Sequence, residues 1–181
     1  MDLIQFWGLI EESRRQSGSD PAGQAAILAT MLSGFSIDEI IQFESFLVDL
    51  LWRAYDAKLI GASTIIVEDM DDDDFMDFRL WLVSQGRFAY EQSLKDPETL
   101  ADLVDQDQCV KAFEMGSVAH EAYRKKTGKD DFHCVYAPPP SPELKNESFV
   151  WQTKEGYADV DRLRVLFPRL WAKFGDHFDS E

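Results

Sequence analysis

Hydrophobic residues recur at intervals of three and four positions along much of the chain, which is the spacing of a helix with one buried face. The clearest example follows Ser36-Ile37-Asp38-Glu39, a capping box whose hydroxyl and carboxylate each satisfy a free backbone N–H group. The apolar face behind it consists of Ile40, Phe43, Leu47, Leu50, Leu51 and Ala54. This pattern predicts a central helix that runs to about Leu59 and is roughly 30 Å long.

An aspartate marks most of the other predicted helix starts, because its carboxylate accepts a hydrogen bond from a free N–H group in the first turn. Proline follows two of them, and it suits the first helical position since it lacks an N–H group. The predicted starts are Asp2, Asp20 before Pro21, Asp96 before Pro97, and either Asp159 or Asp161, with Pro168 breaking or restarting the last helix. Gly86 and Gly128 stand where left-handed C-terminal caps are expected, and residues 109–126 are predicted to form one helix.

Two segments depart from the helical pattern. Gly61-Ala62-Ser63-Thr64 is expected to interrupt or end the central helix, and residues 65–67 fit either a further helical turn or a buried strand. Residues 129–158 form an irregular, proline-containing segment, in which 132–136 and 149–153 are candidates for the two strands of a small β-hairpin. We therefore predict a mainly α-helical fold: a single compact multi-helix domain over residues 1–181, with this hairpin in its C-terminal third.

An acidic run precedes one of the predicted helices. Seven of the ten residues from Glu68 to Asp77 are acidic, and the apolar face of Phe75, Phe78 and Leu82 follows directly. Asp71 to Asp74 therefore fall in the first turn, where carboxylates cap free N–H groups and each gains roughly 0.3–1 kcal/mol from the helix dipole. We interpret the run mainly as a helix start.

A metal site is the alternative interpretation of the same run. Asp69, Asp71 and Asp73 imitate the first three ligand positions of a calcium-binding EF-hand loop. The match then fails, because Asp74 occupies the position of the required glycine and Leu80 that of the bidentate glutamate. These three aspartates are weak metal candidates, and we predict neither a metal nor a cofactor.

Net charge points to the type of partner. The chain carries 34 acidic and 18 basic residues, a formal charge of −16, and residues 68–107 contain 13 acidic residues against three basic ones. Such a field repels nucleic acid and anionic lipid and attracts basic proteins. A soluble charged surface without any partner explains the composition equally well. The hypothesis for partner binding places the contact at Asp71, Asp72, Asp73, Asp74 and Asp77, and a toxin-neutralising immunity protein fits this description.

The absence of several local sequence motifs argues against the chemistries that those motifs support. The chain contains no GxSxG, Walker or GxGxxG motif, no CxxC pair, and no second histidine four positions after His120. The N-terminus lacks the pattern of a signal peptide, charged residues interrupt the longest apolar stretch, and two cysteines are typical of reduced thiols, so we expect a cytoplasmic protein without a membrane span. These absences favour a non-enzymatic protein. The alternative is an enzyme or a small-ligand or metal-binding protein whose site is assembled from separated helices.

Five segments together resemble a known family. They are Phe6-Trp7-Gly8-Leu9-Ile10, residues 74–82 with Gly86, Asp96-Pro97-Glu98-Thr99-Leu100-Ala101, Tyr123 with residues 126–128, and residues 167–175 (FPRLWAKFG). In this order they resemble the uncharacterised bacterial domain-of-unknown-function family 4240, over most of the chain. That family has no established activity, so the resemblance implies no catalytic or ligand residues. Family members often carry glycine and serine before the acidic pair, where this chain has residues 67–72.

Overall fold

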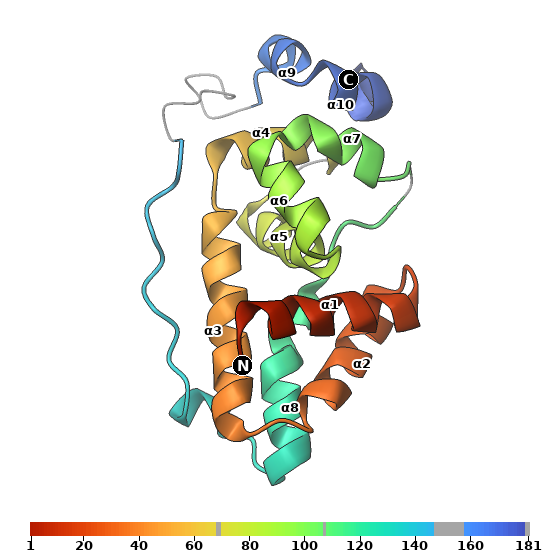
Figure 1. Ribbon diagram of the computed structural model, residues 1–181. Coiled ribbons are helices and arrows are strands. Elements are labelled where there is room, and N and C mark those ends of the chain that lie inside the picture. The colour runs from red at the N-terminus through yellow and green to blue at the C-terminus, as the bar shows by residue number, and fades with distance from the viewer. Residues whose placement is uncertain (68–69, 107, 147–157, 180–181) are drawn as a thin grey trace.

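A computed structural model describes residues 1–67, 70–106, 108–146 and 158–179 (Figure 1). These residues are mainly α-helical, and they contain no strand, only an isolated bridge between Asp56 and Lys145. The α-helices are α1 (Leu3–Ser17), α2 (Pro21–Leu32), α3 (Ile37–Arg53), α4 (Ala57–Ile66), α5 (Asp72–Ser84), α6 (Arg87–Lys95), α7 (Leu100–Leu103), α8 (Val118–Thr127), α9 (Val160–Leu166) and α10 (Pro168–Phe174). Short 3₁₀ turns lie between them, at η1 (Pro97–Thr99), η2 (Phe113–Ser117), η3 (Phe132–Cys134) and η4 (Gly175–Asp179).

Helix α3 runs along the molecule, and the other elements are arranged around its two ends (Figure 1). Around its N-terminal half, α8 packs against α2 and α3, and α1 packs against α2. Helices α4 to α7 surround its C-terminal end, where α5 contacts both α1 and α3. Beyond them, α10 packs on α4 and α7. Residues 137–146 return along the length of α3 (Figure 1).

The predicted central helix is shorter than its hydrophobic pattern suggested. Its capping box at Ser36 and Glu39 is confirmed, but α3 ends at Arg53 and not near Leu59. A new helix, α4, begins after Asp56, whose carboxylate accepts a hydrogen bond from the Lys58 backbone N–H at 2.8 Å. Since both helices bury an apolar face, the spacing of hydrophobic residues hardly changes at this break. Residues 61–64 lie inside α4 and do not interrupt a helix.

Most of the predicted helix boundaries are confirmed, with three corrections. Asp2 forms a capping box with Gln5, and Gly128 has the predicted left-handed conformation, with φ 71°. Helix α2 begins at Pro21, although the Asp20 side chain makes no capping hydrogen bond. The C-cap of α5 is Gln85, whereas Gly86 has φ 96° and precedes α6. The helix predicted over residues 109–126 begins only with η2 and α8, so its first four residues are not helical.

The β-hairpin prediction is wrong for its first strand. Phe132 begins the 3₁₀ turn η3, and the Tyr136 N–H donates to the Phe132 carbonyl at 3.0 Å, as in a helical turn. The chain turns here because the buried Phe132 ring packs on Tyr123 and Tyr136, at centroid distances of 5.5 and 5.9 Å. The second proposed strand, residues 149–153, lies outside the described residues.

Side chains from three distant elements cap the C-terminal end of α3. The last four carbonyls of a helix have no partner within it, so they need donors from elsewhere. Tyr90 Oη donates to the Leu50 carbonyl at 2.6 Å, and Arg79 Nη1 donates to the Leu51 carbonyl at 3.0 Å. Lys145 Nζ donates to the carbonyls of Trp52 and Arg53, at 3.3 and 3.2 Å. Two of these donors are cations, which the negative end of the helix dipole favours.

Arg79 is the more buried of the two cationic donors, with 5% of its surface exposed. Its guanidinium lies 4.7 Å from the Phe75 ring centroid and 5.3 Å from that of Tyr55, and its Nε donates to the Phe75 carbonyl at 3.2 Å. Burial lowers the pKa of Arg79. An arginine nevertheless stays charged in proteins, so the carbonyls and ring faces take the place of water around it.

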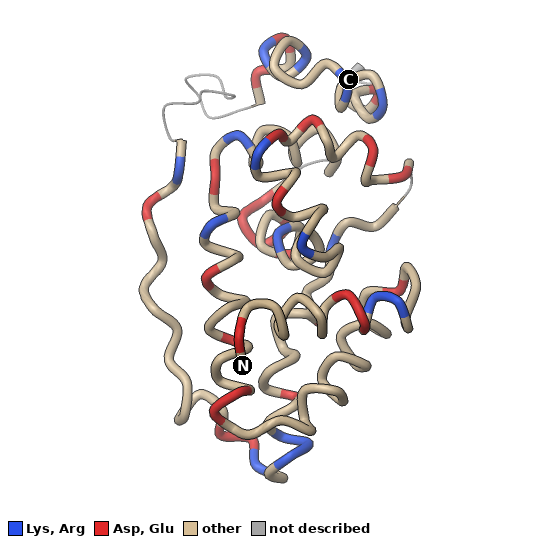
Figure 2. The backbone as a smooth tube through the Cα atoms, viewed as in Figure 1, with Lys and Arg blue, Asp and Glu red and all other residues tan. Residues whose placement is uncertain are grey.

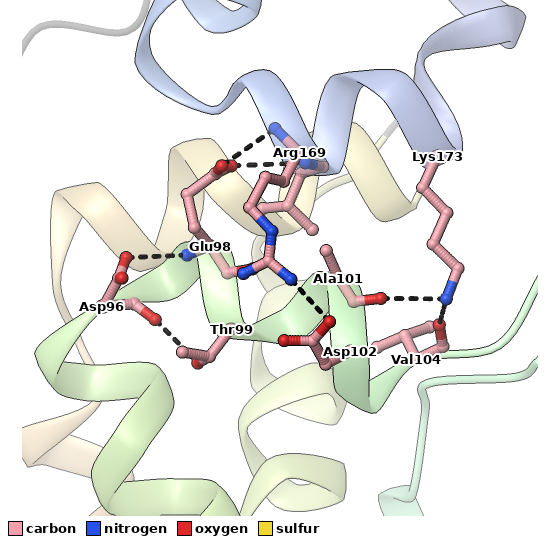
Figure 3. Close-up of polar contacts among 9 residues, drawn as sticks. Asp96, Glu98, Thr99, Ala101, Asp102, Val104, Arg169 and Lys173 are labelled. Carbon is pink, nitrogen blue, oxygen red and sulfur yellow. Dashed lines mark hydrogen bonds and ion pairs between the residues drawn. The ribbon is translucent and has the colours of Figure 1, made fainter.

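The C-terminal helices are attached by a polar latch, which we define as Glu98 and Asp102 with Arg169 and Lys173 (Figure 3). Pro168 begins α10 as predicted, and the Glu98 carboxylate accepts the backbone N–H groups of Arg169 and Leu170 at 2.9 and 3.3 Å. Arg169 Nη2 reaches Asp102 at 2.5 Å, and Lys173 Nζ donates to the carbonyls of residues 101 and 104 at 2.9 and 2.6 Å. Glu98 therefore caps a helix that lies more than seventy residues later in the chain.

Replacing Arg79 tests the capping of α3. Arg79→Met keeps much of the side-chain volume but leaves the Leu51 carbonyl without its donor, so we expect a loss of about 2–4 kcal/mol in the free energy of unfolding. Urea denaturation measures this loss. The control is Arg87→Met, which removes an exposed ion pair with Glu91 and should change stability by less than about 0.5 kcal/mol. Equal effects of the two substitutions would contradict the capping role.

Replacing Glu98 tests the polar latch. Glu98→Ala removes the acceptor for two backbone N–H groups of α10, so the amides of α10 should exchange with solvent about three- to tenfold faster. Hydrogen exchange followed by mass spectrometry measures this, with Glu91→Ala as the matched control on a neighbouring helix. Unchanged exchange in α10 would show that its apolar contacts alone hold it.

Candidate functional site

The acidic run is a helix start, as predicted. Asp71 is the N-cap of α5, and its carboxylate accepts a hydrogen bond from the Asp74 N–H at 2.8 Å. Asp72 and Asp73 follow in the first turn, and all of Asp71 to Asp73 are exposed. One carboxylate of the run therefore caps the helix, while two others face solvent next to the positive end of the helix dipole.

The five aspartates of the partner hypothesis fall into two groups, according to whether they interact with Lys111. It forms an ion pair with Asp74. Burial raises the pKa of the half-buried Asp77, and the charge of Lys111 opposes this shift. The Asp77 carbonyl also accepts the Ala112 N–H at 3.3 Å, which keeps the Lys111 segment against α5. Asp74 and Asp77 are thus engaged within the molecule, whereas Asp71, Asp72 and Asp73 are exposed.

Two of the three weak metal candidates, Asp71 and Asp73, lie in the described parts of the chain. Asp69 lies outside the described residues, Asp71 caps α5, and Asp73 is exposed. Across the described parts of the chain, no group of three His, Cys, Asp or Glu side chains is placed to hold a metal ion. Both cysteines, Cys109 and Cys134, are exposed free thiols.

A second cluster of titratable side chains lines a hollow that the sequence analysis missed. The hollow has a volume of ≈ 250 Å³ and lies between α3, α8 and η3. Its lining side chains are Glu44, His120, Phe132, His133, Tyr136 and Pro138, and we call it the Glu44 pocket. The signal for it was present, because Glu44 lies four residues after Ile40 and three before Leu47, on the apolar side of α3.

The Glu44 carboxyl group lacks the partners that a buried charge normally has. Its Oε2 atom is shielded from solvent and accepts no hydrogen bond from the described residues. Burial raises the pKa of Glu44 to about 7. Burial, followed by the charge of Glu44, raises the pKa of the Tyr136 phenol, while the nearby Ser45 side chain opposes this shift. A carboxyl group and a phenol that influence one another therefore lie together on the pocket wall.

His120 is partly exposed and forms an ion pair at the edge of the pocket. Its Nε2 atom lies 2.7 Å from Asp130 Oδ1, and 41% of its side chain is exposed. Its ring is roughly parallel to that of Phe132, with centroids 6.3 Å apart. His120 thus forms one wall of the Glu44 pocket while Asp130 holds its outer nitrogen.

A larger hollow of ≈ 440 Å³ lies between the end of α1, the start of α2 and the end of α5. Its polar side chains hold these helices together. Arg14 Nη1 donates to the Gln85 carbonyl at 3.2 Å, and the buried Gln24 donates to the Ser84 carbonyl at 3.0 Å. We therefore assign this hollow to the packing of the fold.

Comparison with known proteins places the chain by family. A family model described as "Protein of unknown function (DUF4240)" matches residues 1–125. The chain belongs to the DUF4240 family. No curated protein and no solved structure matches it. The family model ends within α8, so it includes Glu44, His120 and Glu98 but not Tyr136 or Arg169.

The description of the DUF4240 family names no function, so any inference about activity has to come from the side chains of the candidate sites. The helices that the structure describes include none long and apolar enough to cross a bilayer.

Replacing Glu44 tests its raised pKa. The carboxyl group titrates near pH 7 in the folded protein and near its ordinary value of 4.5 when unfolded. The folded state therefore holds the proton more tightly, and this group's contribution to stability is full below about pH 4.5 and is lost as the pH rises to about 7. Glu44→Gln should remove this loss.

The measurement is the free energy of unfolding of both proteins between pH 4.5 and 8. The wild type should lose about 1–2 kcal/mol more than Glu44→Gln over this range, after allowance for partial exposure of the side chain. Taking the difference cancels the other titrating groups. A flat difference would mean that Glu44 titrates normally.

Proposed function

We propose that this DUF4240 protein is a non-enzymatic interaction module that binds a basic protein through the carboxylates at the start of α5. We call this surface the acidic face: Asp71, Asp72 and Asp73, with Asp74 and Asp77 at its inner edge. The observation that carries the proposal is that the first three are exposed and form no ion pair with the described lysines and arginines, whereas Lys111 already occupies Asp74. Carboxylates that the described lysines and arginines leave unpaired are available to a partner.

The packing of α5 beneath the acidic face favours partner binding. Behind the carboxylates, α5 buries Phe75, Phe78 and Trp81, which are between 0 and 4% exposed. The helix start is therefore held in place before any partner arrives. A preorganised surface loses less conformational entropy on binding than a flexible loop does.

The charge of the whole protein acts in the same direction. Acidic positions occur throughout the described trace and outnumber lysine and arginine (Figure 2). A net charge of −16 accelerates the approach of a basic protein and disfavours that of a phosphate backbone. A toxin neutralised by an immunity protein is one partner of this kind.

The first step of the test is to identify the partner. The purified protein serves as bait in a lysate of its own host, bound proteins are eluted with a salt gradient, and mass spectrometry identifies them. A basic protein released by moderate salt supports the proposal. The absence of any basic partner argues against it.

The second step is a charge-matched comparison with that partner. Asp72→Asn/Asp73→Asn keeps the Asp71 cap and should slow association about three- to tenfold at low salt and weaken its salt dependence. The control, Asp38→Asn/Asp161→Asn, removes the same charge from the exposed first turns of α3 and α9. Association rates measured by surface plasmon resonance separate the two. Equal slowing by both variants would mean that only net charge matters and that the acidic face is not the contact.

A further inference from the structure

The Glu44 pocket contains a carboxylate oxygen that lacks a hydrogen-bond donor among the described residues. A buried carboxylate oxygen is costly unless an N–H or O–H group donates to it, and Glu44 Oε2 has no such donor among the described residues. The carboxyl group still lines a hollow that a ligand can enter. A group that brings hydrogen-bond donors into this hollow would supply the Glu44 carboxyl group with a donor that the described residues do not give its Oε2 atom.

The walls of the pocket restrict the chemical class of that group. The rings of His120, Phe132 and Tyr136 form a row of roughly parallel faces, with successive interplanar angles of 29° and 20°. Aromatic faces attract cations, because the ring quadrupole places negative charge on them. A carboxylate beside aromatic faces is the combination that suits an ammonium or guanidinium group attached to carbon.

Size and overall charge narrow the class further. At ≈ 250 Å³, the pocket lies below the usual range of about 300–1,000 Å³ for drug-sized ligands, so it holds a small molecule or a single side chain. The net charge of −16 raises the local concentration of cations and lowers that of anions. A metal ion fits poorly, since the described residues supply no group of three ligating side chains.

We propose that the Glu44 pocket binds a small organic cation, whose ammonium or guanidinium group contacts the Glu44 carboxylate while its carbon atoms lie against the Phe132 and Tyr136 rings. A free amine and a lysine or arginine side chain share this chemistry. The site is separate from the acidic face, and its proposal does not depend on the partner that the acidic face binds.

Binding is coupled to the protonation of Glu44. Its pKa of about 7 means that roughly half of the molecules carry the proton near neutral pH. A bound cation favours the ionised form, so binding near pH 6.5 should release a proton. The other titratable groups that face the pocket are His120 on α8, which lies against Asp130, and His133 and Tyr136 in and after η3.

The experiment is calorimetric titration of the full chain with n-butylammonium chloride at pH 6.5. Repeating it in two buffers of different ionisation enthalpy counts the protons released. Pentan-1-ol, of similar size but uncharged, serves as the comparison ligand. We expect butylammonium to bind at least tenfold more tightly than pentan-1-ol and to release a fraction of a proton.

Two variants show whether Glu44 is responsible. Glu44→Gln keeps the shape of the side chain, and it should weaken butylammonium binding at least tenfold and abolish the proton release. Glu143→Gln removes the same charge from an exposed position in the segment that follows the pocket, and it should leave both unchanged. Circular dichroism checks that both variants are folded. Equal affinities of Glu44→Gln and Glu143→Gln, or no binding of butylammonium by the wild type, would overturn the proposal.

A third probe distinguishes the two sources of the cation. It is the capped tripeptide acetyl-Gly-Lys-Gly-amide, which presents the same ammonium group on a peptide backbone. Tighter binding of the tripeptide than of butylammonium assigns the pocket to a lysine side chain of a protein, and the reverse assigns it to a free amine. Because Asp72→Asn/Asp73→Asn leaves the pocket intact, loss of the proposed partner function and loss of amine binding can be told apart.

Discussion

The C-terminal end of α3 is the point at which three other segments of the chain are joined to it. Its carbonyls need donors, and the donors come from α5, α6 and the segment before residue 146. Satisfying one helix end therefore fixes the positions of three other segments. Arg79 contributes most to this, because a buried guanidinium without carbonyl acceptors and ring faces around it would be strongly destabilising. Helix α5 is thus positioned through its interior, and its acidic start is left free at the surface.

This arrangement separates structural charge from available charge. Asp74 and Asp77 interact with Lys111, and Glu98 and Asp102 interact with α10. The exposed carboxylates at the start of α5 form no ion pair with the described lysines and arginines, and Asp71 caps the helix. The acidic side chains behind the net charge of −16 therefore differ in role: some maintain contacts between elements, and others face solvent.

Local signals in the sequence predicted local structure well. The capping boxes at Asp2 and Ser36, the left-handed Gly128 and the helix start at Asp71 each depend on residues within one turn, and the structure confirms them. The break between α3 and α4 was missed because two buried helices in sequence keep one hydrophobic spacing across a short turn. The strand predicted at 132–136 was wrong, since Phe132 and Tyr136 stand four positions apart, a spacing that suits a helical turn folded onto the core.

Sites made from distant residues were beyond the same reasoning. Nothing near Glu44 in the sequence indicates that the 132–138 segment will cover it, although its place on the apolar side of α3 marks it as unusual. Likewise, the direct contact between the DPETLA and FPRLW segments at Glu98 and Arg169 follows only from the fold.

The contact between Lys145 and the end of α3 can form only late in the synthesis of each chain. The carbonyls of Trp52 and Arg53 receive their lysine donor from a residue more than ninety positions later. At ribosomal rates of about 5–20 residues per second, that donor emerges roughly 5–20 s after the helix it completes. During this interval, the two carbonyls lack their lysine donor, and residues 137–146 have yet to lie along α3. The capping of the C-terminal end of α3 is therefore completed well after the helix itself has been synthesised.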